Sequence, residues 1–378
     1  MTNSEHYARL VDVIFGPHTT AFDTNKTHSN RVIGAIANPN NFIEFKANFS
    51  ARLRRLNRAT TVNPVLRRPV INAVNQVAGY SNWDGAFAEL AALDYFLSDP
   101  ATDAINIELD VTVSALDTLA SEMGKTNVNY DMRLPSFGVS LDTKVLKDKT
   151  GDILDGIFKK VLEKKGLTYL PIIPCYPFDH PYSAFQDKLT ALFVELLAAV
   201  DTNTRPARFT SKVIPELSYQ FAWNKGVYVT AHSHLPTDHA LNHQRLLFGY
   251  ANKFSKVEPS AIVLVHFPWT GEKLYIDSQR MAFFKELGNR FFNAYIGEPD
   301  LAQSVIGSFK TSISAEAVTK HLSGVVYLED MCITESDPDR ANVTASYIWN
   351  HHALHSLIAS SFDSYLKRRD ATDLSAIP

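Results

Sequence analysis

The segment from Val128 to Leu146 constrains the fold of this chain more than any other. Apolar and polar residues alternate through Val128-Asn-Tyr-Asp-Met-Arg-Leu134, and the alternation resumes through Val139-Ser-Leu-Asp-Thr-Lys-Val145. The segment Pro135-Ser-Phe-Gly138 separates the two runs. A period of two on both sides of a turn that contains proline and glycine predicts two short strands joined as a hairpin.

Three charged residues lie on this predicted hairpin. Asp131 is on the first strand, while Asp142 and Lys144 are two apart on the second, so the side chains of that pair leave the same face. Charges on an otherwise apolar hairpin are costly to desolvate unless they pair or bind a metal. Two carboxylates suit Mg²⁺, and a lysine beside such an ion can orient or deprotonate a water molecule. The combination predicts metal-assisted hydrolysis, most naturally of a phosphodiester.

Helical and alternating patterns surround the hairpin in a defined order. They predict a helix over 83 to 98, a strand over 104 to 113, then after the hairpin a helix over 151 to 164 and a strand over 167 to 173. This order, with Asp131 and Asp142-Thr-Lys144, resembles the PD-(D/E)XK nuclease superfamily over residues 83 to 175. Tyr130-Asp131 stands where the family often has Pro-Asp, and Asp142 stands where Glu is commoner.

The resemblance implies an α/β (α+β) fold of restriction-endonuclease type, with a mixed sheet flanked by helices. It implies that Asp131, Asp142 and the backbone carbonyl of Thr143 hold Mg²⁺, with Mn²⁺ as a substitute ion. Glu89, on the preceding helix, would complete the metal site or else face solvent. Lys144 would position or deprotonate the attacking water. The substrate expected from the resemblance is DNA.

Composition bounds the class of protein. The chain has 378 residues, of which 45% are hydrophobic and 20% are charged, as in an ordinary globular protein. Two cysteines are too few for a disulfide framework, and no apolar run approaches the roughly 18 residues that cross a bilayer, so we expect a cytoplasmic protein without a membrane span. No phosphate-binding loop motif occurs, which predicts that no nucleotide cofactor is used.

The expected organisation has three parts. A mainly helical, basic region covers 1 to 80, the nuclease-like core covers 81 to 175, and an α/β extension or second domain covers 176 to 378. In this last part the patterns predict strands over 212 to 223, 226 to 231, 261 to 266 and 325 to 329, with helices over 182 to 200, 278 to 295 and 343 to 367.

The first 80 residues carry ten Lys and Arg against four Asp and Glu. Four of the basic residues, Arg52, Arg54, Arg55 and Arg58, lie on a helix predicted over 41 to 58. They are candidates for contacts with DNA phosphates. The alternative is a solvated face that pairs with acidic residues elsewhere.

The function expected from these features is a Mg²⁺-dependent DNA endonuclease of restriction type, acting alone or as a homodimer that cuts both strands. Two alternatives stay open. One is a nuclease-like fold without an active metal site that binds nucleic acid or protein. The other is a zinc hydrolase that uses His232, His234, His239 and His243. Glu108 and Asp110, on the first strand, are rivals for a metal-facing carboxylate.

Overall fold

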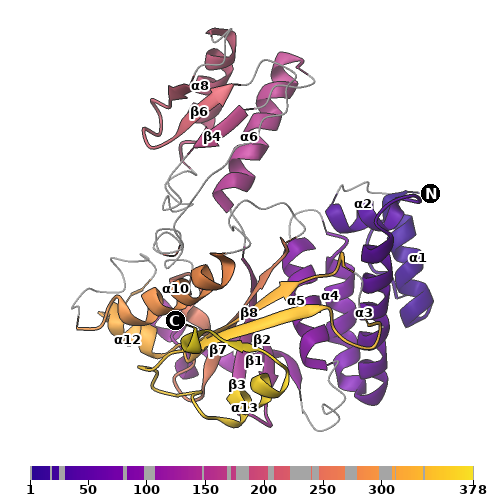
Figure 1. Cartoon of the computed structure of the whole chain (residues 1–378), viewed down its shortest axis with the longest axis vertical. Coiled ribbons are helices and arrows are strands. Elements are labelled where there is room, and N and C mark those ends of the chain that lie inside the picture. The colour runs from indigo at the N-terminus through magenta and orange to yellow at the C-terminus, as the bar shows by residue number, and fades with distance from the viewer. Residues whose placement is uncertain are drawn as a thin grey trace. The chain divides into compact units, whose positions relative to one another are not determined.

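The computed structural model (Figure 1) describes residues 2–17, 19–24, 30–79, 83–97, 107–146, 149–167, 172–175, 187–202, 208–221, 240, 247–268, 279–297, 309–310, 312–334 and 337–377. The chain forms two compact units. The first unit comprises Met1–Leu146, Arg245–Glu272 and Gly288–Pro378, and the second comprises Lys147–Gln244 and Lys273–Leu287. In sequence, both segments of the second unit are therefore insertions into the first.

A seven-stranded mixed sheet organises the first unit. Its strands are β1 (Glu108–Ser114), β2 (Asn127–Leu134), β3 (Val139–Val145), β7 (Ser260–His266), β8 (Gly324–Asp330), β9 (Val343–Trp349) and β10 (Thr372–Asp373), in that order across the sheet. The first three strands are antiparallel, β3, β7 and β8 are parallel, β9 returns antiparallel, and β10 runs parallel to β9. Every residue of β7 and β8 is buried, as expected for central strands covered on both faces.

Helices of the N-terminal region pack on this sheet within the same core. They are α1 (Asn3–Phe15), α2 (Arg31–Ala37), α3 (Ile43–Val62), α4 (Arg67–Gln76) and α5 (Trp83–Leu97). Figure 1 shows them gathered on one side of the sheet, and α5 packs directly against β3 and β7. The ring of Phe87 on α5 lies 5.5 Å from that of Phe49 on α3 and 5.4 Å from that of Phe267. Because α5 is covered by the sheet and by α3 and α4, it is buried around nearly its whole circumference.

The expected helix over 83 to 98, the hairpin and the strand before it are confirmed as α5, β2 with β3, and β1. The strand predicted over 167 to 173 is not found beside the hairpin. The parallel neighbour of β3 is β7, about a hundred residues further along than the predicted 167 to 173. The predicted helix and strand exist as α6 (Lys149–Lys165) and β4 (Ile172–Cys175), but they belong to the second unit. The inserted segment happens to supply a helix and a strand in the expected order.

The chain therefore divides differently from the expected parts 1–80, 81–175 and 176–378. Residue 80 marks no boundary, because α3 and α4 share one hydrophobic core with α5 and the sheet. The second unit has its own core, formed where α6 and α8 (Leu189–Thr202) pack with a three-stranded antiparallel sheet in the order β4-β6-β5. The predicted strand over 212 to 223 is observed as β6 (Ser218–Phe221), and β5 is Arg208–Thr210. The predicted strand over 226 to 231 lies outside the described residues.

The C-terminal prediction is wrong in part. Strands over 261 to 266 and 325 to 329 and the helix over 278 to 295 are found as β7, β8 and α10 (Arg280–Asn293). The helix predicted over 343 to 367 is instead β9 followed by α13 (Ser361–Arg368). Residues 343 to 349 read Val-Thr-Ala-Ser-Tyr-Ile-Trp, rich in β-branched and aromatic residues, and they pair along the whole of β8. Among the helices described here, none is long and apolar enough to cross a membrane.

Candidate active site

The candidate site lies where β2 and β3 separate. The two strands pair only at Leu134 with Val139, Arg133 with Ser140 and Met132 with Leu141. One residue beyond the last pair, Asp131 and Asp142 come opposite each other. We call this opening the strand fork. Met132 and Leu141 are buried in the core on one face of the sheet. Because side chains alternate along a strand, the neighbouring Asp131 and Asp142 lie on the opposite face, at the fork.

At the fork, backbone N–H and C=O groups that have no partner on the neighbouring strand form hydrogen bonds with side chains of the site. The Thr143 N–H donates to the Asp131 carboxylate, with N and Oδ2 2.7 Å apart. The Lys144 ammonium donates to the Thr143 carbonyl at 2.9 Å, and the Lys253 ammonium donates to the Asn129 carbonyl. Buried backbone groups need such partners, so the open strand end and the charged side chains stabilise each other.

The two carboxylates and two ammonium groups are in mutual contact. Lys144 Nζ lies 2.5 Å from Asp142 Oδ2 and 3.5 Å from Asp131 Oδ2. Lys253 Nζ lies 3.0 Å from Asp142 Oδ1 and 3.9 Å from Asp131 Oδ1. Asp142 is 2% exposed, and among the described residues no backbone or neutral donor reaches its oxygens; only ammonium groups face them. A buried carboxylate held in this way is ready to exchange its partners for another cation.

Sequence reasoning missed Lys253 and Tyr250. Lys253 ends a short 3₁₀ helix, Ala251–Lys253, which comes shortly before β7. The Tyr250 ring lies 5.4 Å from the Lys144 ammonium, a distance at which the ring stabilises a cation. Both residues reach the site only because β7 pairs with β3 across the inserted unit, so no local spacing in the sequence could have identified them.

Burial and neighbouring negative charge raise the pKa of two carboxyl groups at or near the fork, Glu89 and Asp131. Burial, followed by the negative charge of Asp131, raises the pKa of Glu89 to about 7. Burial, followed by the charge of Asp142, raises the pKa of Asp131 to about 6, although both lysines act in the opposite direction. Burial alone would lower the pKa of Lys144, but the charges of Asp142 and Asp131 outweigh it and raise that pKa. Glu89 thus lies within electrostatic range of Asp131 and Asp142.

The rival carboxylates on β1 differ from each other. Glu108 pairs with Arg133, with Nη1 and Oε2 3.7 Å apart, on the outer part of the sheet. Asp110 adds to the negative charge that raises the pKa of Glu89, so it lies near the fork. Its φ of 53° is left-handed, and pairing between β1 and β2 is interrupted at this residue. A non-glycine residue in this conformation costs roughly 1 kcal/mol or more.

The donor set can be compared with what Mg²⁺ requires. No group of three or more His, Cys, Asp and Glu spaced to hold a metal is found in the described part of the chain. Asp131, Asp142 and the Thr143 carbonyl nevertheless offer hard oxygen atoms, and the Asp142 oxygens take no neutral donor. Burial first, and neighbouring negative charges second, raise the pKa of Glu89 and of Asp131, and a divalent cation beside them would favour their ionised forms. The residues therefore fit a Mg²⁺ ion once the ammonium groups give way. The predicted zinc ligands His232, His234, His239 and His243 lie outside the described residues.

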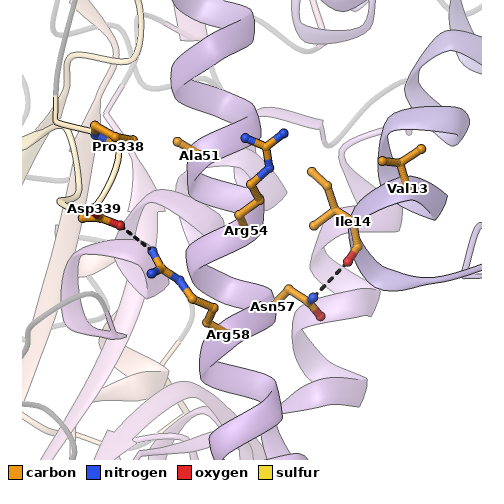
Figure 2. Close-up of a pocket in the computed structure, with 8 residues that line it drawn as sticks. All are labelled: Val13, Ile14, Ala51, Arg54, Asn57, Arg58, Pro338 and Asp339. Carbon is orange, nitrogen blue, oxygen red and sulfur yellow. Dashed lines mark hydrogen bonds and ion pairs between the residues drawn. The ribbon is translucent and has the colours of Figure 1, made fainter.

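The four arginines predicted to contact DNA are divided between two environments. Arg52 and Arg55 are 1% and 7% exposed and form ion pairs with Asp94 of α5; Arg52 also pairs with Asp330. The prediction is wrong for these two, because α3 turns this face toward α5. Arg54 and Arg58 are exposed and line a surface pocket between α1, α3 and the segment at Pro338 and Asp339 (Figure 2). Arg58 pairs with Asp339 at 3.0 Å.

Comparison with known proteins finds no matching family model, no matching curated protein and no matching solved structure.

Proposed function

We propose that this protein is a Mg²⁺-dependent DNA endonuclease whose active site is the strand fork. The observation that carries the proposal is the meeting of Asp131, Asp142 and Lys144 on neighbouring strands, within electrostatic range of Glu89 on the preceding helix. The sheet order supports it, since three antiparallel strands follow α5 and a fourth strand, β7, runs parallel to the third. The helix, the three strands and the further strand of the resembled order are present in this sheet, whereas the helix predicted between the third and fourth strands, α6, lies in the second unit.

Each residue then has a role that follows from its contacts. Asp131, Asp142 and the Thr143 carbonyl would hold the ion, with Glu89 as a further carboxylate. When bound, Mg²⁺ offsets the charge that develops on the phosphate oxygens. Lys144, which contacts both carboxylates, would position or deprotonate the attacking water. Arg54 and Arg58 remain candidates for phosphate contacts, and a homodimer would let two copies cut both strands.

One observation favours a second candidate, a binding module with the same fold. Two carboxylates and two ammonium groups balance each other in the fork, and such a cluster can serve as a structural ion-pair network. This alternative predicts nucleic-acid or protein binding without any response to Mg²⁺.

Plasmid cleavage distinguishes the two candidates. Wild-type protein is incubated with supercoiled DNA in Mg²⁺, with and without EDTA, beside Lys144→Ala and the control Lys256→Ala. Lys256 is a matched lysine because it pairs with Glu122 at 2.7 Å and is 26% exposed, close to the 25% of Lys144. We expect cleavage by wild type and Lys256→Ala only with Mg²⁺, and a loss of about 10²- to 10⁴-fold in Lys144→Ala. Discrete fragments would identify a restriction-type enzyme. Cleavage by Lys144→Ala at the wild-type rate would contradict the proposed site.

A further inference from the structure

Lys253 makes the fork symmetric in charge. Lys144 contacts the Oδ2 atoms of Asp142 and Asp131, and Lys253 contacts the Oδ1 atoms of the same two carboxylates. The resembled nuclease motif provides for the first lysine only. The second ammonium therefore needs an explanation of its own.

The backbone that carries Lys253 is held firmly. Tyr250 N donates to the Leu247 carbonyl at 3.1 Å, and Lys253 N donates to the Tyr250 carbonyl at 2.8 Å. The next residue, Phe254, is fully buried, and its carbonyl accepts from Leu119 N at 3.0 Å. The position of the Lys253 backbone is thus fixed, while its four-carbon side chain is 17% exposed and ends on the carboxylates.

The balance of charge decides what happens to the lysines when a cation enters. Two ammonium groups offset two carboxylates, so a divalent ion on Asp131 and Asp142 balances the carboxylates by itself and leaves both lysines repelled. When the ion takes the Thr143 carbonyl, Lys144 keeps the Tyr250 ring beside its ammonium group. Beyond the carboxylates, the one anchor the structure gives Lys253 among its described residues is the Asn129 carbonyl, on an exposed residue. Lys253 is therefore displaced from the carboxylates when the ion binds.

We propose that Lys253 is a positioning residue for the substrate phosphate, held on Asp142 and Asp131 in the free protein and displaced when the cation binds. This inference rests on the proposed function. In the free protein Lys253 competes with the cation for the carboxylates. In the loaded protein its ammonium group contacts a non-bridging phosphate oxygen of the nucleic-acid backbone near the fork. A merely structural lysine would instead link β2 to the 251–253 turn and would leave both binding events unchanged.

Two binding measurements without turnover test this role. Calorimetry with Ca²⁺ alone is carried out on wild type, Lys253→Gln, Lys253→Arg and the control Lys256→Gln. Removal of the competing ammonium should tighten Ca²⁺ binding by about fivefold in Lys253→Gln, whereas the arginine variant and the control stay near wild type. Fluorescence anisotropy of a DNA duplex in Ca²⁺, from about 50 to 200 mM salt, should show weaker binding by Lys253→Gln and a salt slope reduced by about one. Lys253→Arg should restore the slope.

The outcomes separate this inference from the proposed function. If wild type binds Ca²⁺, Asp142→Asn does not, and Lys253→Gln matches wild type in both measurements, the inference fails while the proposed function stands. If neither wild type nor Lys253→Gln binds Ca²⁺, both are overturned. A lower melting temperature for Lys253→Gln with unchanged binding would assign the residue a structural role and would also overturn the inference.

Discussion

Two clusters of charge, each with two acidic and two basic residues, lie in the same unit of this protein and have opposite character. The strand fork joins Asp131 and Asp142 to Lys144 and Lys253. The second cluster, here called the arginine–aspartate network, joins two arginines of α3 to aspartates of α5 and β8. Its members are Arg52, Arg55, Asp94 and Asp330.

The network satisfies its hydrogen-bonding groups directionally. Arg52 binds both oxygens of Asp330, at 3.1 and 2.8 Å, and reaches Asp94 through Nε at 3.3 Å. Arg55 binds both oxygens of Asp94 at 2.7 Å and donates to the Pro338 carbonyl. Planar guanidinium groups fix such geometry, and all four residues are buried. The network therefore holds helices and sheet together and leaves no ligand site.

The fork uses compact ammonium groups on flexible stems instead. Its lysines are 17% and 25% exposed, and the buried Asp142 oxygens receive no directional donor from the described backbone. A metal ion can replace an ammonium group at such an oxygen, but it cannot replace a bidentate arginine without leaving buried donors unpaired. The contrast shows that the two clusters differ in the geometry of their donors and not in the number of charges.

The largest expected effect is on the free energy of unfolding, and it tests the difference between the arginine–aspartate network and the fork directly. Asp94→Asn should lower the free energy of unfolding by about 3 to 5 kcal/mol, because it leaves two buried guanidinium groups with one carboxylate. The matched change in the fork, Asp142→Asn, should alter it by no more than about 1 kcal/mol, since both lysines can turn toward water. Urea unfolding at pH 7 in EDTA measures both. Equal losses in the two variants would mean that the fork is structural as well.

A smaller effect concerns the pH dependence of the metal-free protein. The folded-state pKa of Glu89, about 7, lies above the ordinary glutamate value of 4.5, so the folded protein binds the proton more tightly than the unfolded chain. Stability is therefore lost as pH rises through the window from about 4.5 to 7. Glu89→Gln removes this loss and should be more stable than wild type at pH 8 by roughly 1 to 3 kcal/mol, with little difference below pH 4.5.

Unfolding of both proteins at pH 4.5 and pH 8, in EDTA, measures this difference. The control is Glu316→Gln. Lys320 lowers the pKa of Glu316, so this variant should not gain stability relative to wild type as pH rises. Binding of Ca²⁺ should have the opposite pH dependence in wild type, tightening from pH 6 to 8, because the ion requires ionised carboxylates. Parallel pH profiles for wild type and Glu89→Gln would place Glu89 in solvent and outside the site.

The sequence predicted the local part of this site and not the distant part. Asp131, Asp142 and Lys144 follow from a period-two pattern that fixes which residues share a strand face, and the structure brings these three together. Lys253 and Tyr250 arrive through the pairing of β3 with β7, a contact across the inserted unit that no local pattern encodes. In the same way, the spacing of Arg52 and Arg55 gives their positions on the helix, but only packing against α5 reveals that Asp94 meets them.

The smallest expected effect separates two neighbours on α3. Arg54 is exposed beside the pocket in Figure 2 and has no ion-pair partner among the described residues, whereas Arg55 is buried in the arginine–aspartate network. Arg54→Gln should leave stability within about 0.5 kcal/mol of wild type, because it removes a solvated charge. If Arg54 contacts a phosphate, the variant should bind a DNA duplex in Ca²⁺ only a few times more weakly, with a salt slope lower by about one.

Arg55→Gln is the matched control on the adjacent position, and it should lose about 2 kcal/mol or more in urea unfolding since the Asp94 carboxylate is left with fewer donors. Fluorescence anisotropy across a salt series supplies the binding side of the comparison. An unchanged slope for Arg54→Gln would remove Arg54 from the nucleic-acid surface. Arg58 would then be the exposed candidate left in the predicted set, because Arg52 and Arg55 are buried between α3 and α5.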